Sequence, residues 1–180
     1  MTTTKRCGDY DLISRIGEGS FAKVYRSTHV IRSGTFAVKA ILREKIDVSP
    51  KFQENLESEI SIMRDYLHPN IVRLYEHFVL GRYIYLVLEF CPGEDLNKFI
   101  KKRGRLDERV ARGFLRQLAD GLEFLNQKNL IHRDLKPANV LMSEKSDNAV
   151  LKLADFGFAR RLEAAAMAAT SCGTPLYMVS

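Results

Sequence analysis

The spacing of apolar residues divides the chain into a first part rich in strands and a second part rich in helices. Short apolar runs bounded by turn residues predict strands over residues 10–16, 22–28, 71–78 and 83–90. Residues 28–41 read as two short strands that meet at a turn at Ser33-Gly34. Apolar residues three and four positions apart predict helices over residues 52–67, 95–102 and 107–127.

The longest predicted helix is amphipathic, and its polar start is typical of a helix N-terminus. Asp107 suits the N-cap position. The expected apolar stripe consists of Ala111, Phe114, Leu115, Leu118, Leu122 and Leu125. After Asn129 only brief apolar pieces follow, and the Ala-rich stretch "LEAAAMAAT" is compatible with a short helix or a mobile loop. No repeat or linker indicates an independent second domain.

Composition limits the class of protein. With 180 residues, 46% hydrophobic and 28% charged, the chain can build one substantial core. The formal net charge is +6, but Lys and Arg are scattered, which favours a solvated basic surface over nucleic-acid binding. Three widely spaced cysteines form neither a metal-ligand spacing nor a disulfide framework. Without a signal peptide or a long apolar run, we expect no membrane span and a cytoplasmic location.

The stretch "IHRDLKPANV" carries the strongest chemical signal. An acid, cations and an amide fall within eight residues that Pro137 prevents from forming one helix. Such a loop suits activation of a hydroxyl beside a metal-bound phosphate. An isolated Arg-Asp pair would be read as a polar surface loop, but the spacing matches H-R-D-L-x-x-x-N in full. The residues concerned are His132, Arg133, Asp134, Lys136 and Asn139.

Three further motifs follow a fixed order around this loop. "DFG" places Asp155 after a short apolar strand, where a carboxylate can bind a hard divalent cation. "IGEGSFAKV" places Gly17 and Gly19 between strands, either as a plain hairpin turn or as a phosphate-binding turn. In "FAVKAI", Lys39 lies in an apolar strand and needs an anionic partner. Glu59 is the natural candidate, although alone it would read as part of a solvated helix face.

Together these motifs resemble those of the eukaryotic protein kinase family, from about Tyr10 to Met178. "DLKPAN" is similar to the serine/threonine form of the catalytic loop. "LVLEFCPGEDL", "NLIHRDLKPANVLMS", "LADFGFAR" and "MAATSCGTPLYM" resemble the autophagy-initiating ULK kinases most closely.

The resemblance implies an α+β, protein-kinase-like bilobal fold. The small lobe would be complete, an antiparallel five-stranded sheet plus one helix, and the helical large lobe would be incomplete. Residues 1–9 would be an N-terminal tail, 10–91 the small lobe and hinge, and 92–180 a partial large lobe ending in the activation segment.

The implied activity is ATP-dependent phosphorylation of protein Ser/Thr, with Mg²⁺, in autophagy initiation. The implied partners are protein substrates and autophagy regulatory proteins. The implied catalytic residues are Asp134, Lys136, Lys39 and Glu59. The implied ATP-binding residues are Gly17, Gly19, Val24, Ala37, Lys39, Leu88, Glu89, Cys91, Asp95, Leu141 and Asp155. The implied metal ligands are Asn139 and Asp155, and the implied regulatory residues are Thr170 and Arg133.

The chain departs from the family pattern at three places. Ala22 replaces the third glycine of the phosphate loop, and Gly93-Glu94-Asp95 stands where the family has Gly-Gly-Asp. Val179-Ser180 stands where the family continues Ala-Pro-Glu, so we expect a kinase truncated within the activation segment. Two alternatives stay open: a nucleotide- or partner-binding module without turnover, or a fragment of a full-length kinase.

Overall fold

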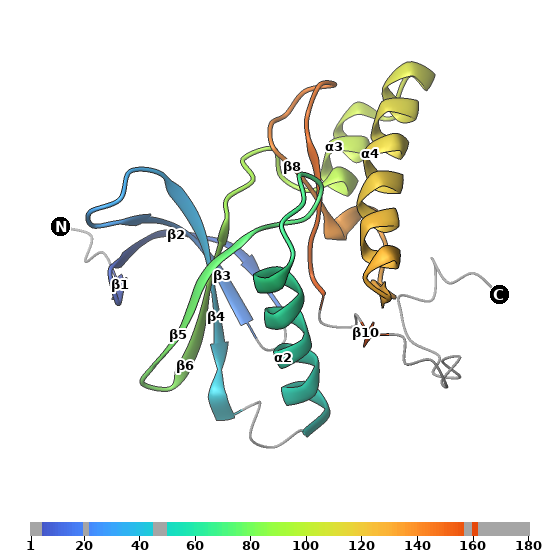
Figure 1. Ribbon diagram of the computed structural model, residues 1–180. Helices are drawn as coiled ribbons and strands as arrows, with labels where there is room; N and C mark the ends of the chain where they lie inside the picture. Colours follow the sequence, from blue (N-terminus) through green and yellow to red (C-terminus); the bar gives the residue numbers. More distant parts are fainter. Residues whose placement is uncertain (1–4, 20–21, 45–49, 157–159, 162–180) are drawn as a thin grey trace. The chain divides into compact units, whose positions relative to one another are not determined.

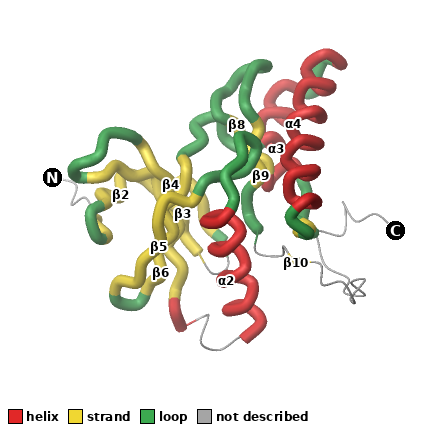
Figure 2. Tube along the Cα trace, in the orientation of Figure 1, coloured by secondary structure: helices red, strands yellow, loops and turns green. Residues whose placement is uncertain are grey.

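The computed structural model describes residues 5–19, 22–44, 50–156 and 160–161. The chain divides into two compact units, Met1–Glu54 with Arg73–Phe90, and Asn55–Val72 with Cys91–Ser180. The long strands, yellow in Figure 2, belong to the first unit, whereas the helices α3 (Leu96–Arg103) and α4 (Glu108–Gln127), red in Figure 2, belong to the second. The order of strand-rich and helix-rich parts therefore follows the prediction.

The first unit is one antiparallel sheet in the order β1-β2-β3-β4-β6-β5 (Figure 1). Its strands are β1 (Lys5–Cys7), β2 (Tyr10–Glu18), β3 (Ala22–His29), β4 (Thr35–Leu42), β5 (Leu74–Leu80) and β6 (Tyr83–Glu89). Two register shifts in β2 let this strand run through Gly17 to Glu18, beyond the predicted end at Ile16. Bulges of this kind bend a strand without ending its pairing.

The sheet has six strands, which corrects the expected five-stranded sheet. Lys5–Cys7, within the segment expected to be a tail, pairs with β2 and covers its edge. Cys7 is fully buried, and Arg6 forms an ion pair with Asp11 at 2.8 Å. A single buried residue and one ion pair thus hold a strand that is too short to show an alternating pattern.

One face of this sheet carries the core of the first unit. The alternation along β4 places Phe36, Val38 and Ala40 on this face, opposite Tyr85 and Val87 of β6. Cys7, Tyr10 and Leu12 complete the cluster. Tyr10 also donates a hydrogen bond to Glu76, which satisfies its buried hydroxyl. The same alternation turns the intervening β4 residues, among them Ala37 and Lys39, to the opposite face.

The second unit consists of helices and two short two-stranded sheets. Its elements are α3 (Leu96–Arg103), α4 (Glu108–Gln127), β7 (Leu130–Ile131), η1 (Pro137–Asn139), β8 (Val140–Met142), β9 (Leu151–Leu153) and β10 (Arg160–Arg161). The two sheets are β7 with β10 and β8 with β9. The helix α2 (Pro50–Asp65) begins in the first unit and ends in the second. α4 packs on β7 and β9, and α3 packs on η1 and β8. None of the described helices is long and apolar enough to cross a membrane.

The buried side of α4 differs from the predicted stripe. Val110, Phe114, Gly121 and Leu125 are buried, whereas Leu115 is 64% exposed. At Gly121 the helix approaches β9 closely, since an added Cβ would come within 3.1 Å of the Leu153 side chain. The hydrophobic pattern alone could not indicate this close approach.

Candidate active site

In the second unit, the loop between β7 and β8 holds a buried carboxylate, that of Asp134. Lys136 Nζ lies 2.8 Å from Asp134 Oδ2. Asn139 Nδ2 donates to the same oxygen and to the carbonyl oxygen of Asp134, both at 2.9 Å. Pro137 starts the turn η1, which brings Asn139 back toward Asp134. The fold thus places a cation and an amide around one carboxylate oxygen.

His132 precedes this loop as a buried, neutral imidazole. Burial lowers the pKa of His132, more than its hydrogen bond to the Ala154 carbonyl and the nearby aspartates raise it. Nε2 lies 3.0 Å from the Ala154 carbonyl, and Nδ1 accepts from the Asp134 N–H. A single neutral tautomer with the proton on Nε2 satisfies both contacts. The ring also lies 5.0 Å from that of Phe156, so His132 links the loop to the residue after Asp155.

Asn139 and Asp155 lie at the open end of the β8–β9 hairpin. Val140 pairs with Leu153, and the Ala154 N–H donates to the Asn139 carbonyl at 2.9 Å. In both hydrogen bonds to Asp134, Asn139 donates through its side-chain nitrogen Nδ2. Its side-chain oxygen is therefore directed away from that carboxylate. An amide oxygen and an exposed carboxylate are donors that a hard divalent cation prefers. The two residues therefore fit a divalent cation shared with phosphate oxygens.

Two residues of these motifs have left-handed backbone conformations. Arg133 has φ of 61° and Asp155 has φ of 63°. Non-glycine residues pay about 1 kcal/mol or more for this conformation, which is retained where the surrounding contacts determine it. Each φ value turns the chain sharply beside Asp134 or Asn139. The backbone is thus strained at the two carboxylates that the sequence singles out.

The first unit brings together most of its predicted nucleotide-binding residues. Val24 pairs with both Gly17 of β2 and Lys39 of β4, and Ala37 pairs with Leu88 of β6. Because cross-strand partners share a face, all five lie on the side of the sheet opposite the core cluster. Between β2 and β3, the Gly19 N–H donates a hydrogen bond to the Ala22 carbonyl at 2.8 Å. The Glu89 N–H donates to the Arg73 carbonyl at 2.9 Å, so only its carbonyl could bind a base.

In the second unit, the residues after Cys91 form a ladder with β8. Gly93 N–H donates to the Met142 carbonyl and Met142 N–H to the Glu94 carbonyl, both at 2.9 Å. Asp95 and Leu141 are paired in the same ladder. A Cβ on Gly93 would come within 2.4 Å of the Glu144 carbonyl oxygen, so only glycine fits there. Asp95 also caps α3 through the Lys98 N–H at 2.8 Å.

A polar frame that the sequence analysis missed holds β9 in place. Gln117 Oε1 accepts from Asn70 Nδ2 at 3.1 Å and from the Leu151 N–H at 2.8 Å. Gln117 Nε2 donates to the Ala149 carbonyl at 3.0 Å. Asn70 Nδ2 also donates to the Leu151 carbonyl at 2.9 Å. The one available signal was a glutamine between apolar residues of the predicted α4 stripe.

Some predicted contacts remain predictions. Lys39 is half-buried in the first unit and Glu59 is buried in the second, so their pairing would join the two units. Cys91 begins the second unit as a half-buried residue. Thr170 lies outside the described residues, and so does its expected contact with Arg133. Within the described ranges, no three His, Cys, Asp or Glu side chains form a metal-binding group.

Phosphoryl transfer in protein kinases uses an aspartate of the catalytic loop together with an asparagine and a second aspartate that hold metal ions, and the second unit has these residue types in Asp134, Asn139 and Asp155. In a comparison with protein families, the family described as the protein kinase domain matches residues 10–179. The chain therefore belongs to the protein kinase family, and its α+β kinase fold is confirmed. Family membership implies use of ATP and a divalent metal. The boundaries proposed at residues 9 and 91 stay predictions.

Three similar proteins are serine/threonine-protein kinases named ATG1a, atg1 and ATG1b. The chain is 49% identical to serine/threonine-protein kinase ATG1a of Arabidopsis thaliana over 178 residues, 99% of this chain and 28% of the relative. It is 44% identical to serine/threonine-protein kinase atg1 of Dictyostelium discoideum over 180 residues, 97% of this chain and 27% of the relative. Identity to ATG1b of Arabidopsis thaliana is 46% over 171 residues, 95% and 24% of the two chains. The chain spans about a quarter of these relatives' length.

Proposed function

We propose that this chain carries the catalytic site of an ATP-dependent serine/threonine protein kinase that acts in autophagy initiation. The observation that carries the proposal is the grouping of Asp134, Lys136 and Asn139 around one carboxylate oxygen. The serine/threonine specificity rests on "DLKPAN" and on the names of the relatives. The role in autophagy initiation rests on the similarity to the ULK kinases.

The transfer step assigns each group of the loop a task. Asp134 orients the Ser or Thr hydroxyl of the substrate and accepts its proton as the oxygen attacks the γ-phosphorus of ATP. The bond from that phosphorus to the bridging oxygen breaks, and ADP leaves with the electron pair. Lys136 places a positive charge beside the transferred group, where charge develops. The fixed loop geometry supports this role because catalysis of phosphoryl transfer depends on positioning and charge.

Asn139 and Asp155 would hold the divalent cation, for which we propose Mg²⁺. Bound there, the ion would neutralise charge on the ATP phosphates. In the first unit, Gly17 and Gly19 would approach the phosphates and Lys39, held by Glu59, would pair with them. Val24, Ala37 and Leu141 would enclose the adenine, with Leu88 behind it. The carbonyl of Glu89 would accept a hydrogen bond from the base, and the backbone of Cys91 would form another. Asp95 would bind the ribose.

Regulation, partners and location are part of the same proposal. Phosphorylation of Thr170 would give Arg133 a charge-assisted partner and order the activation segment. Thr170→Ala should then lower the rate of phosphate transfer, and an unchanged rate would remove Thr170 from the proposal. Protein substrates and autophagy regulators would be the partners, and the cytoplasm the location.

The test compares Asp134→Asn with Asp120→Asn, a matched change at an exposed aspartate of α4. ATP with Mg²⁺ should raise the melting temperature of both variants and of the original chain. Phosphate transfer from ATP to a Ser/Thr peptide should fall by about two orders of magnitude or more in Asp134→Asn alone. Stabilisation by ATP without any transfer in the original chain would refute the enzyme and favour a nucleotide-binding module. Equal transfer by both variants would refute the role of Asp134.

A further inference from the structure

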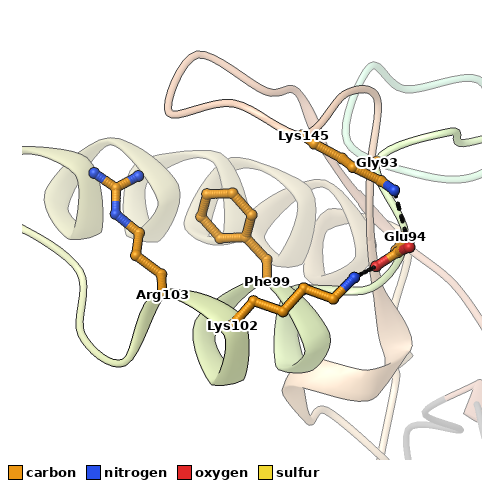
Figure 3. A pocket seen from close by; sticks show the side chains of 6 residues that line it. All are labelled: Gly93, Glu94, Phe99, Lys102, Arg103 and Lys145. Atoms are coloured by element: carbon orange, nitrogen blue, oxygen red, sulfur yellow. Dashed lines mark hydrogen bonds and ion pairs between the residues drawn. The ribbon is translucent and has the colours of Figure 1, made fainter.

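Glu94 occupies a conformation that glycine usually takes. Its φ is 68°, in the left-handed region that costs non-glycine residues about 1 kcal/mol. The strain is accompanied by two contacts that a glycine could not make. Glu94 Oε2 lies 2.7 Å from Lys102 Nζ, and Oε1 lies 3.0 Å from Lys145 Nζ. Figure 3 shows the two ammonium groups meeting at this one carboxylate.

The two lysines come from different segments of the second unit. Lys102 lies in the last turn of α3, and Lys145 in the turn between β8 and β9. Hydrogen bonds from Lys102 and then Lys145 lower the pKa of Glu94 to about 2, so the carboxylate stays charged at neutral pH. Glu94 therefore ties the end of α3 to the β8–β9 turn, while its own backbone belongs to the ladder with β8.

A pocket of about 250 Å³ lies beside the ion pairs that Glu94 makes with Lys102 and Lys145. Phe99 and Arg103 line it together with Gly93, Glu94 and the two lysines (Figure 3). Arg103 pairs with Asp147 of the β8–β9 turn, which gives α3 a second link to that turn. Arg103 and Asp147 make none of the backbone hydrogen bonds described for the ladder with β8, whereas Glu94 makes one of them. Of these two ion-pair contacts, only the one made by Glu94 includes a residue of the ladder.

The geometry points to Glu94 as a positioning residue for the nucleotide, an inference that rests on the proposed ATP site. Asp95 follows Glu94 directly and pairs with Leu141 in the ladder. These two residues are the ones assigned to the ribose and to one face of the adenine. With the carboxylate removed, only the Arg103–Asp147 pair still connects the end of α3 to the β8–β9 turn, and we expect the distance between Asp95 and Leu141 to vary more. A solvated ion pair without this role would affect stability and leave nucleotide affinity unchanged.

Two variants separate these readings. Glu94→Gln keeps the stem and removes the charge, while Glu94→Gly also relieves the strain at φ of 68°. Both should weaken binding of AMP and of MgATP by about two- to fivefold, since exposed ion pairs contribute modestly. The ratio of the two affinities should stay constant, because the phosphates are bound elsewhere. The Glu94→Gly variant should keep its melting temperature within about 3 °C, which separates lost affinity from lost stability.

The experiment measures dissociation constants for AMP and MgATP by calorimetry on the chain and its variants. The double change Lys102→Met with Lys145→Met should reproduce the loss, and adding Glu94→Gln to it should cause no further loss. Glu108→Gln, which breaks the exposed pair with Arg112 on α4, is the matched control and should leave both constants unchanged. Affinities within about 1.5-fold in both Glu94 variants would overturn the inference and leave the ATP site standing. Failure of the original chain to bind either nucleotide would overturn the proposed function itself.

Discussion

Gln117 should contribute more to stability than any exposed glutamine of α4, because three hydrogen bonds meet at its amide. Gln117→Leu keeps a similar volume and removes bonds to Asn70, Leu151 and Ala149. Ala149 and Leu151 are fully buried, so water cannot replace the lost contacts. An orphaned buried N–H costs about 1–3 kcal/mol, and each further bond adds about 0.5–1.5 kcal/mol. With one orphaned N–H and two further lost bonds, we expect a loss of about 2–6 kcal/mol in the free energy of unfolding.

The measurement is urea unfolding followed by far-UV circular dichroism, since the chain has no tryptophan. The transition midpoint should fall without a change in slope. A loss of this size corresponds to a fall of about 4–24 °C in melting temperature for a chain of this length. Gln127→Leu is the matched control, because Gln127 is exposed at the end of the same helix. It should change stability by less than about 0.5 kcal/mol. Equal stability of the two variants would refute the assigned role of the frame.

Three other predictions concern Gly93, Cys7 and His132. Gly93→Ala forces a Cβ against the Glu144 carbonyl and should lower the melting temperature and abolish stabilisation by MgATP; normal values of both would contradict the close approach. Burial raises the pKa of Cys7 to about 11, so at about pH 8 iodoacetamide should modify Cys91 first and Cys7 only in urea, as peptide mass spectrometry would show. The lowered pKa of His132 means that below about pH 6.5 the unfolded chain binds a proton that the native chain does not. The free energy of unfolding should therefore fall with acidification, less steeply in His132→Asn, and equal slopes would refute burial of a neutral imidazole.

The motifs were predictable because their chemistry is local. Asp134, Lys136 and Asn139 lie within six positions, so a proline-broken loop was enough to bring them together. The two strands of the β8–β9 hairpin appeared in the sequence as brief apolar pieces, but their pairing was not predicted. The shared face of Ala37 and Lys39 followed from the period of two in a strand.

What could not be predicted depends on partners distant in sequence. Lys5–Cys7 is an exception, because it pairs with the nearby residues 10–12 and is only too short to show an alternating pattern. Gln117 gains its role from Asn70, 47 positions away, and nothing in either local sequence indicates the pairing. Glu94 was visible as a departure from Gly-Gly-Asp, but Lys145, 51 positions on, was not visible as its partner.

The central claim is that the loop around Asp134 transfers phosphate from ATP to a protein hydroxyl. The most direct test is transfer of the γ-phosphoryl group to a Ser/Thr peptide, measured beside MgATP affinity in the original chain and in Asp134→Asn. We predict equal MgATP affinity and a loss of about two orders of magnitude or more in transfer rate. Transfer that persists at the original rate in Asp134→Asn would contradict the account.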